Sequence, residues 1–557
     1  MDVKRLLLVI PLAVVAYLMV VQWNKDYDQP AAETQAPQVA SQAANATAQG
    51  LEAPSSSTTA NGDTGLSTPD SAASTPSNNL IEVKTDVLDL RIDPQGGDVV
   101  YAALLEHKQN NASESPFVLL SDNQSRSYVA KSGLQLDGHK GRIAFSADSN
   151  SYSLAEGDDS LQVDLKADIN GVAVIKRFTV SQDSYQIKVD YLLDNQSQQP
   201  VNARFIGQLA RDNSADPTSG GGMGMKSYLG AAFSSEENHY QKVDFEDIQD
   251  GSFKNVDVQG GWVSMIQHYF VSAWVPADNQ KNLYYANVDK QNRNVAAFAS
   301  PTTQIAAGQQ AELGATLFVG PKDQDQLEAT APSLELVVDF GWLWFLANPL
   351  FWLLEHIHAL VGNWGASIIL LTVLVKVVLF PLSATAYRSM AKMRKMGPEM
   401  QRIKEKYGSD RQKVSQEMMK FYQTEKINPL GGCLPIVIQM PVFIALYWML
   451  MESVELRHAP FMLWIQDLSV KDPLFILPII MGLTMFIQQQ LNPTPPDPTQ
   501  AKIMKMLPIV FTFFFLWFPA GLVIYWVVNN IISVAQQYFI TRSIEKDPSV
   551  GKGMRTK

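Results

Sequence analysis

One residue in this 557-residue chain stands out chemically, because Lys376 is a single charge inside the apolar segment Ala366-SIILLTVLVKVVLFP-Leu382. A charge at membrane depth costs roughly 2.5–3.5 kcal/mol on insertion scales, so a span that keeps one usually turns it toward a bundle interior or a water-filled cavity. Alternatively, the long side chain snorkels to the membrane surface. Thr372 lies four residues earlier and therefore shares a helix face with Lys376.

The other apolar segments contain few polar residues. Such neutral groups commonly form hydrogen bonds between helices, worth about 0.6–2 kcal/mol each. Together with Lys376 they are candidates for lining a polar groove open to the cytoplasm. The candidates, besides Thr372, are Gln439, Asn529, Asn530, Ser533, Gln536 and Gln537.

Charge divides the chain into two parts. Residues 1–340 hold 23 Lys+Arg and 42 Asp+Glu, whereas residues 341–557 hold 21 and 13. This asymmetry indicates two compartments, and the acidity of the first part argues against DNA or other nucleic acid as its partner. Cys433 is the only cysteine, so no disulfide within the chain stabilises the exported part.

The N-terminal residues favour a membrane anchor. Lys4 and Arg5 precede an apolar run, and the sequence after that run, Gln22-Trp23-Asn24-Lys25, is a poor signal-peptide cleavage site. A cleaved signal peptide is the alternative. Residues 25–79 are rich in Ala, Ser, Thr, Gln and Pro, which is typical of a disordered tether.

Residues 80–336 have the pattern of an all-β domain. Apolar and polar residues alternate over 161–169, Asn170-Gly171 supplies a tight turn, and a second strand is expected over 172–180. Recurrent strands of this kind predict a large antiparallel β-sandwich. The Gly-rich segment 219–226 lacks the ending of a phosphate-binding loop.

The second part predicts five further membrane spans. The Phe518-Pro519-Ala520-Gly521 sequence is typical of a turn between the last two. With the N-terminal anchor these make six spans. Basic loops are expected in the cytoplasm, which places both termini inside and the β-domain outside. The expected segments are 1–24 anchor, 25–79 tether, 80–336 β-sandwich, 337–363 interfacial helix, 364–382 second span, 383–428 cytoplasmic helical hairpin, 429–451 third span, 452–473 periplasmic loop, 474–490 fourth span, 491–502 cytoplasmic loop, 503–518 fifth span, 519–540 sixth span and 541–557 basic cytoplasmic tail.

The hairpin over 383–428 holds 11 Lys+Arg and 5 Asp+Glu, and Gly408-Ser409-Asp410 is its expected turn. A stripe of methionines follows helical spacing on its first arm. Flexible thioethers suit varied apolar ligands, but they equally suit packing of the hairpin itself. These candidates for early capture of a substrate are Met390, Met393, Met396 and Met400.

No cofactor, metal or catalytic residue is expected. Glu355, His356 and His358 lack the HExxH spacing, and residues two apart on a helix face different ways. The aromatic-rich segment around them, 337–363, instead predicts an interfacial helix on the outer membrane surface.

Three segments carry a family resemblance: Met390-AKMRKMGPEMQRIKEKYGSDRQKVSQEMMKFYQTEKINPLGGCLPIVIQMPVFIALYWML-Met451, Ser453-VELRHAPFMLWIQDL-Ser469 and Leu516-WFPAGLVIY-Trp526. They resemble the YidC family of bacterial membrane protein insertases. The resemblance covers the whole membrane half. It implies a multi-pass α-helical inner-membrane protein with a five-helix insertase core and, in the Gram-negative form, a large periplasmic all-β sandwich domain.

The resemblance also implies a function and roles for several residues. Such proteins insert newly made membrane proteins, alone or beside the Sec translocon, and help them fold; the ribosome and the lipid bilayer are further expected partners. The family's groove carries a basic residue, usually Arg, where this chain has Lys376, which keeps the charge but loses the bidentate fork. A substrate slide is implied around Met440, Phe443 and Phe515.

Two other functions remain open from the residues alone. A small-solute transporter usually shows repeat symmetry across its spans, and no internal repeat is evident here. A structural anchor that displays the β-domain leaves Lys376 and the basic hairpin without an explanation.

Overall fold

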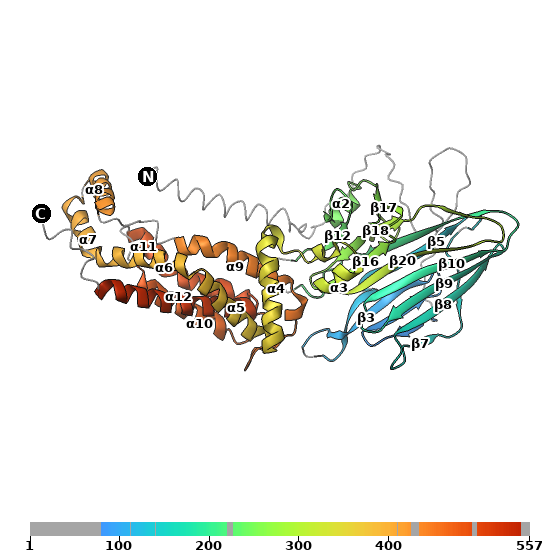
Figure 1. Ribbon diagram of the computed structural model, residues 1–557, viewed down its shortest axis with the longest axis horizontal. Coiled ribbons are helices and arrows are strands. Elements are labelled where there is room, and N and C mark those ends of the chain that lie inside the picture. The colour runs from blue at the N-terminus through green and yellow to red at the C-terminus, as the bar shows by residue number, and fades with distance from the viewer. Residues whose placement is uncertain are drawn as a thin grey trace, which may run out of the picture.

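The computed structural model describes residues 79–111, 113–139, 141–219, 227–408, 410–424, 434–492 and 498–546. The expected anchor, nearly all of the tether, most of the Gly-rich segment 219–226, Cys433 and the end of the basic tail lie outside these residues. The described chain forms a β-domain at one end and a group of helices at the other, with helix α4 standing between them (Figure 1).

The β-domain contains two large sheets. Within the described residues the first has eleven strands in the order β14-β17-β18-β11-β5-β4-β3-β2-β1-β7, with β19 paired to β11. Neighbouring strands are antiparallel except for the β1–β7 pair. Its strands are β1 (Ile81–Lys84), β2 (Leu88–Asp93), β3 (Asp98–Lys108), β4 (Pro116–Asn123), β5 (Arg126–Leu136), β7 (Ser151–Ser153), β11 (Val201–Arg211), β14 (Val256–Gln259), β17 (Lys281–Val288), β18 (Asn294–Ala299) and β19 (Thr303–Ile305).

The second sheet has nine described strands in the order β13-β12-β15-β16-β20-β10-β9-β8-β6. They are β6 (Ser146–Ala147), β8 (Ser160–Ile169), β9 (Val172–Ser181), β10 (Gln186–Asn195), β12 (Gly230–Phe233), β13 (Gln241–Val243), β15 (Val263–Ile266), β16 (Phe270–Pro276) and β20 (Gln310–Pro321). The predicted hairpin is confirmed, because β8 pairs with β9 in the register Ile169↔Val172. Asn170 and Gly171 both have positive φ there, 52° and 83°, as the tight turn requires.

The two sheets pack face to face. Phe205 of β11, in the first sheet, lies with its ring centroid 5.8 Å from Trp274 of β16 and 5.6 Å from Tyr191 of β10, both in the second. All three side chains are buried, and such tilted aromatic pairs are favourable beyond their buried area. The expectation of a large β-sandwich is therefore confirmed.

Helices follow the β-domain. They are α3 (Gln324–Thr330), α4 (Trp344–Val361), α5 (Trp364–Val378), α6 (Phe380–Lys395), α7 (Gly397–Lys406), α8 (Arg411–Thr424), α9 (Leu434–Glu452), α10 (Ile476–Leu491), α11 (Pro498–Phe514) and α12 (Ala520–Lys546). Helix α2 (Phe245–Gln249) lies within the β-domain, and short 3₁₀ turns cover η1 (Leu334–Val337), η2 (Gly341–Leu343), η4 (Val454–Leu456) and η5 (Phe515–Trp517). Helix α12 begins directly after Pro519, so the expected turn before the last helix is present.

The segment expected as the second span is bent. Helix α5 ends at Val378 and α6 starts at Phe380, and the two axes differ by 68°. Pro381 has no N–H and cannot extend the hydrogen bonding of α5, which accounts for the break. Helix α6 then continues to Lys395, past the expected start of the cytoplasmic hairpin at residue 383.

Within the described residues, only the α5–α6 pair, taken together across this bend, has the length and apolarity of a membrane span. No single described helix does, and α10 is apolar but shorter.

Glu455 in η4 has an unusual environment where the helices meet the β-domain. Its Oε2 atom is buried and has no hydrogen-bond partner among the described residues. Burial raises the pKa of Glu455 to about 8, and the like charges of Asp323, Glu355 and Asp325 add to the rise. The folded protein therefore holds this proton at neutral pH.

The raised pKa predicts a specific pH dependence. The unfolded chain releases the Glu455 proton near pH 4.5 and the folded chain only near pH 8, so the free energy of unfolding falls as pH rises between these values. Glu455→Gln mimics the protonated acid. We expect this variant to melt several degrees above the parent protein at pH 8 and at the same temperature at pH 4.5, measured by thermal unfolding in detergent. Equal melting temperatures at pH 8 would contradict the shifted pKa.

Candidate functional site

Lys376 lies inside the group of helices. Asn363 caps the start of α5, where its Oδ1 accepts a hydrogen bond from the Ala366 backbone N–H at 2.9 Å. Three turns later Lys376 is 3% exposed, and its Nζ donates to Ser533 Oγ of α12 at 2.7 Å. Among the described residues, no carboxylate lies within ion-pairing distance of this ammonium. The side chain thus points into the protein rather than to its surface.

A small polar cluster surrounds the ammonium. We use "polar cluster" for Lys376, Ser533 and Tyr387 of α6, whose side chain shares a hydrogen bond with Ser533. Ser533 Oγ also donates to the Asn529 carbonyl at 2.7 Å. The bend between α5 and α6 brings Tyr387 back to the helix that Lys376 contacts, so three helices build the cluster.

Thr372 is buried on the same face of α5, but its Oγ1 donates to the Ile368 carbonyl at 2.6 Å within its own helix. Within the described part of the chain, Thr372 makes no hydrogen bond to the ammonium.

Helix α12 supplies a polar stripe, which we define as the buried residues Asn530, Ser533, Gln537 and Thr541. Their spacing of three or four places them on one helix face. Asn530 Nδ2 donates to Thr484 Oγ1 of α10 at 3.3 Å, and Gln537 Nε2 donates to Asn492 Oδ1 at 2.9 Å. The side chains of the other two candidates on α12, Asn529 and Gln536, are half-buried beside this stripe.

Several polar atoms near these helices have unused hydrogen-bonding capacity. Gln439 Nε2, Gln536 Oε1 and Gln537 Oε1 are buried without a partner among the described residues. Leaving such groups unpaired costs free energy, so each requires a hydrogen-bond partner from water or from a bound polar group.

The three slide candidates differ in accessibility. Met440 on α9 is 40% exposed, whereas Phe515 is buried. Phe443 is half-buried, and its ring meets Trp526 of α12 edge-on with centroids 4.5 Å apart. Met440 is therefore the exposed member of this set.

The four methionines are mostly packed. Met396 is buried with Phe421, and Met393, Met400, Ile403 and Tyr422 pack around this pair. Met390 is buried, and its Sδ lies 3.8 Å from Gln537 Nε2. The expected turn of the hairpin is supported by Asp410, whose Oδ1 accepts from the backbone N–H groups of Gln412 and Lys413 at 3.0 Å each.

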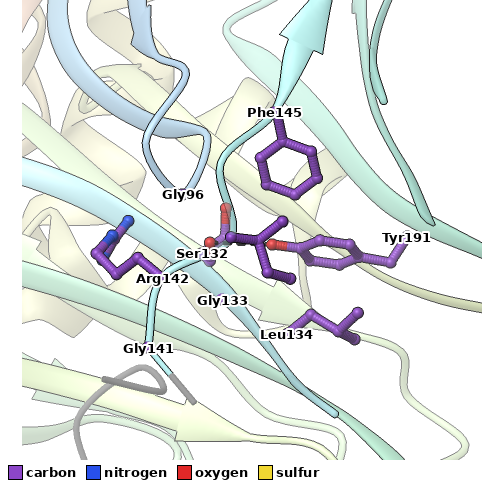
Figure 2. Close-up of a pocket in the computed structure, with 9 residues that line it drawn as sticks. Gly96, Ser132, Gly133, Leu134, Gly141, Arg142, Phe145 and Tyr191 are labelled. Carbon is purple, nitrogen blue, oxygen red and sulfur yellow. Dashed lines mark hydrogen bonds between the residues drawn. The ribbon is translucent and has the colours of Figure 1, made fainter. Parts of the chain in front are cut away.

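A second buried lysine lies in the β-domain. Lys176 of β9 is fully buried, and its Nζ donates to the carbonyls of Gly96, Gly97 and Ser132 at 2.7–2.8 Å. Figure 2 shows the adjoining cavity, with Gly96, Ser132 and Tyr191 at its wall. The cavity has a volume of only about 10 Å³, room for one water molecule. This cation is therefore structural and the cavity is too small for an organic ligand.

Sequence reasoning missed two residues of the helical site. Tyr387 was assigned to the cytoplasmic hairpin, and Pro381 was the available signal that the chain turns before it. Thr484 was overlooked because a lone threonine in an apolar helix has no distinctive spacing.

Comparison with known proteins covers nearly the whole chain. Residues 80–353 match the family described as the YidC periplasmic domain, and residues 356–547 match the family described as the 60Kd inner membrane protein. A membrane protein insertase YidC of Stutzerimonas stutzeri (strain A1501) is 54% identical over 551 residues, which cover 98% of this chain and 99% of the relative. That of Pseudomonas fluorescens (strain SBW25) is 53% identical over 553 residues, with the same coverage of both chains.

Among solved structures, an active YidC insertase with its first transmembrane domain resolved aligns over 84% of this chain and 93% of that chain, at 18% identity and a TM-score of 0.39. A galactose mutarotase related enzyme from Lactobacillus acidophilus aligns over 43% of this chain and 97% of that chain, at 8% identity and a TM-score of 0.29. The assignment rests on the sequence relatives. On their identity and coverage, the chain belongs to the YidC family of membrane protein insertases.

Proposed function

We propose that this protein inserts newly made membrane proteins into the bacterial inner membrane through a polar groove at the polar cluster. The observation that carries the proposal is Lys376, a buried ammonium whose hydrogen-bond partner is the neutral Ser533 and which has no carboxylate beside it among the described residues. An uncompensated buried cation is unfavourable for stability and is well suited to attract an acidic segment.

The mechanism follows from this charge. The polar or acidic N-terminal segment of a substrate enters the groove from the cytoplasm, where Lys376 and the polar stripe replace part of its hydration. The unpaired atoms of Gln439, Gln536 and Gln537 are then available to it. The membrane potential drives acidic residues outward, worth about 2.3 kcal/mol per charge per 100 mV.

The apolar segment of the substrate leaves sideways into lipid along Met440, Phe443 and Phe515. Its transfer from water releases about 25 cal/mol per Å² of apolar surface, which supplies the driving force without a nucleotide. Helix α10 has 16 residues, so it spans about 24 Å and is shorter than a hydrocarbon core of about 30 Å. A thinned bilayer beside it shortens the path for polar residues.

The topology in this proposal has six membrane spans, a five-helix core, cytoplasmic N- and C-termini and a periplasmic β-domain. The charge of the loops supports it, and so does the separation of the β-domain from the hairpin helices α7 and α8, which lie at opposite ends of the molecule (Figure 1). The Sec translocon, the ribosome and the lipid bilayer are the proposed partners. No DNA, metal or cofactor takes part.

Crosslinking tests the proposed path. A photoreactive amino acid at Met440 should crosslink to the apolar segment of a stalled membrane-protein nascent chain. The matched control is the same probe at Ile479 of α10, which is 61% exposed and lies outside the path. Crosslinks at both positions in equal yield, or at neither, would contradict a defined path along α9.

The cytoplasmic hairpin provides a second test. We expect Met393→Ser/Met400→Ser to weaken early crosslinks between the hairpin and a nascent chain, because these two methionines are only partly buried. Met396→Ser is expected to loosen the hairpin itself, since Met396 is buried against Phe421. The measurement is crosslinking yield at equal protein level and equal protease pattern. Unchanged yield in the double variant would assign the methionines to packing.

A further inference from the structure

The end of α9 nearest the β-domain has an unusual cap. The last carbonyl groups of a helix lack partners within the helix. Here the ring Nε2 of His268, between β15 and β16, lies 2.8 Å from the carbonyl oxygen of Met451 in the last turn of α9. A carbonyl only accepts, so Nε2 carries the hydrogen and donates. Burial lowers the pKa of His268, which is consistent with a neutral ring in this tautomer.

An ion pair joins the same two elements. Glu452, the last residue of α9, accepts a hydrogen bond from Lys322 Nζ at 2.5 Å, and the two side chains are 3% and 1% exposed. A carboxylate at a helix C-terminus is disfavoured by the helix dipole, so the lysine offsets two costs, the dipole and the loss of hydration. Lys322 directly follows β20, which pairs with β16 and β10 in the interior of the nine-stranded sheet.

The loop after α9 is held from both sides. Toward the β-domain, the Arg457 guanidinium donates to the carbonyls of Lys108 and Gln109 at 2.7 and 3.1 Å and lies over the ring of Phe117. Toward the helices, the backbone N–H groups of Ala520 and Gly521 donate to loop carbonyls at 2.8 and 2.9 Å. The His268 and Lys322 contacts are therefore part of a continuous, ordered junction.

We propose that the β-sandwich caps the outer end of α9, and that His268 and Lys322 are positioning residues for the helix that carries Met440 and Phe443. Phe443 lies nine residues before Glu452, about 13 Å along the helix. A frayed or displaced final turn changes where this segment of α9 sits against α12. The cap stands on the contacts alone, whereas its effect on insertion rests on the proposed path along α9.

The test uses the full-length protein in lipid nanodiscs and four variants. His268→Phe keeps an aromatic ring against Tyr269, whose ring centroid lies 3.8 Å away, but removes the donor. His268→Gln keeps an N–H donor at similar reach. Lys322→Met strands a buried carboxylate, whereas Lys322→Met/Glu452→Leu removes both charges, a replacement that buried ion pairs often tolerate. Arg177→Met is the control, because it breaks the partly buried Arg177–Asp164 pair elsewhere in the same sheet.

The first readout is amide hydrogen exchange over residues 449–456. We expect roughly tenfold faster exchange in His268→Phe and Lys322→Met, as for the loss of a hydrogen bond to a buried group. His268→Gln, the double variant and Arg177→Met are expected to exchange as the parent does. Unchanged exchange in His268→Phe overturns the cap, and this variant decides the matter if Lys322→Met does not fold.

The second readout is the initial rate of substrate insertion in proteoliposomes. We expect the rate to fall several-fold in the variants with fast exchange and to recover in His268→Gln and the double variant. Fast exchange with an unchanged rate would overturn the positioning role and leave the cap intact. Failure of the proposed path itself shows separately, as missing crosslinks at Met440 in the parent protein.

Discussion

Replacing Lys376 by alanine is expected to reduce the insertion of a substrate with an acidic translocated tail by roughly tenfold or more. A pair of charges about 4 Å apart is worth about 4 kcal/mol at an effective dielectric constant of about 20, and about 1.4 kcal/mol corresponds to a tenfold change. Lys376→Glu is expected to be worse than alanine because it repels the tail. Lys376→Arg keeps the charge and should retain most of the activity. The measurement is protease protection of the translocated tail in proteoliposomes.

A substrate with an uncharged tail provides the control for this experiment. Its insertion should depend much less on residue 376, since only the electrostatic part of the interaction is removed. Ser533→Ala removes the hydroxyl that accepts the hydrogen bond from the Lys376 ammonium, and so tests whether this hydrogen bond is needed for insertion. Equal insertion of the acidic substrate by the parent, Ala, Glu and Arg proteins at equal expression would contradict the electrostatic role.

Lys176→Met is expected to destabilise the β-domain by about 3 kcal/mol or more. The change removes a hydrogen bond to each of the carbonyls of Gly96, Gly97 and Ser132. The Ser132 carbonyl still accepts from the Tyr191 hydroxyl at 3.1 Å, whereas the two glycine carbonyls lose the lysine, and a buried carbonyl left unpaired costs about 1–3 kcal/mol. Lys166→Met on the neighbouring strand β8 is the matched control, because that lysine is exposed and its ammonium forms a surface ion pair with Asp148. The melting temperature of Lys176→Met should therefore be clearly lower than that of Lys166→Met.

The free energy of unfolding of the parent protein should also depend on pH because of Lys176. Burial lowers the pKa of Lys176 to about 7, whereas the unfolded chain keeps this proton until about pH 10.5. The unfolded state thus binds more protons between these values, and the free energy of unfolding gains a contribution that rises with pH across that window. Lys176→Met should lose this rise. A variant with the same pH slope as the parent would show that Lys176 is not its source.

Local signals in the sequence predicted much of this fold. The β8–β9 hairpin was predictable because its alternation and the Asn170-Gly171 turn both lie within about twenty residues. The hairpin turn that includes Asp410 was also predictable, because its signal, Gly408-Ser409-Asp410, lies in three consecutive residues. The bend before α6 was not predicted, because the apolar run continues across Pro381 and has the length of one membrane span.

Long-range contacts were out of reach of sequence reasoning. The charge of Lys376 was evident, but its pairing with Ser533 joins residues 157 positions apart, and nothing in either neighbourhood specifies the other. The His268–Met451 contact spans 183 positions. In both cases the partner is an ordinary residue type, so only the folded arrangement distinguishes it from many equivalents.

The junction between β20 and α9 has a consequence for how the molecule is made. Lys322 precedes Glu452 by 130 residues, so a ribosome finishes the whole β-sandwich before the last turn of α9 exists. The domain has no cysteine and needs no oxidation step before it folds. Every residue of the β-domain surface that contacts the last turn of α9 through Lys322 and His268 is therefore synthesised before that turn.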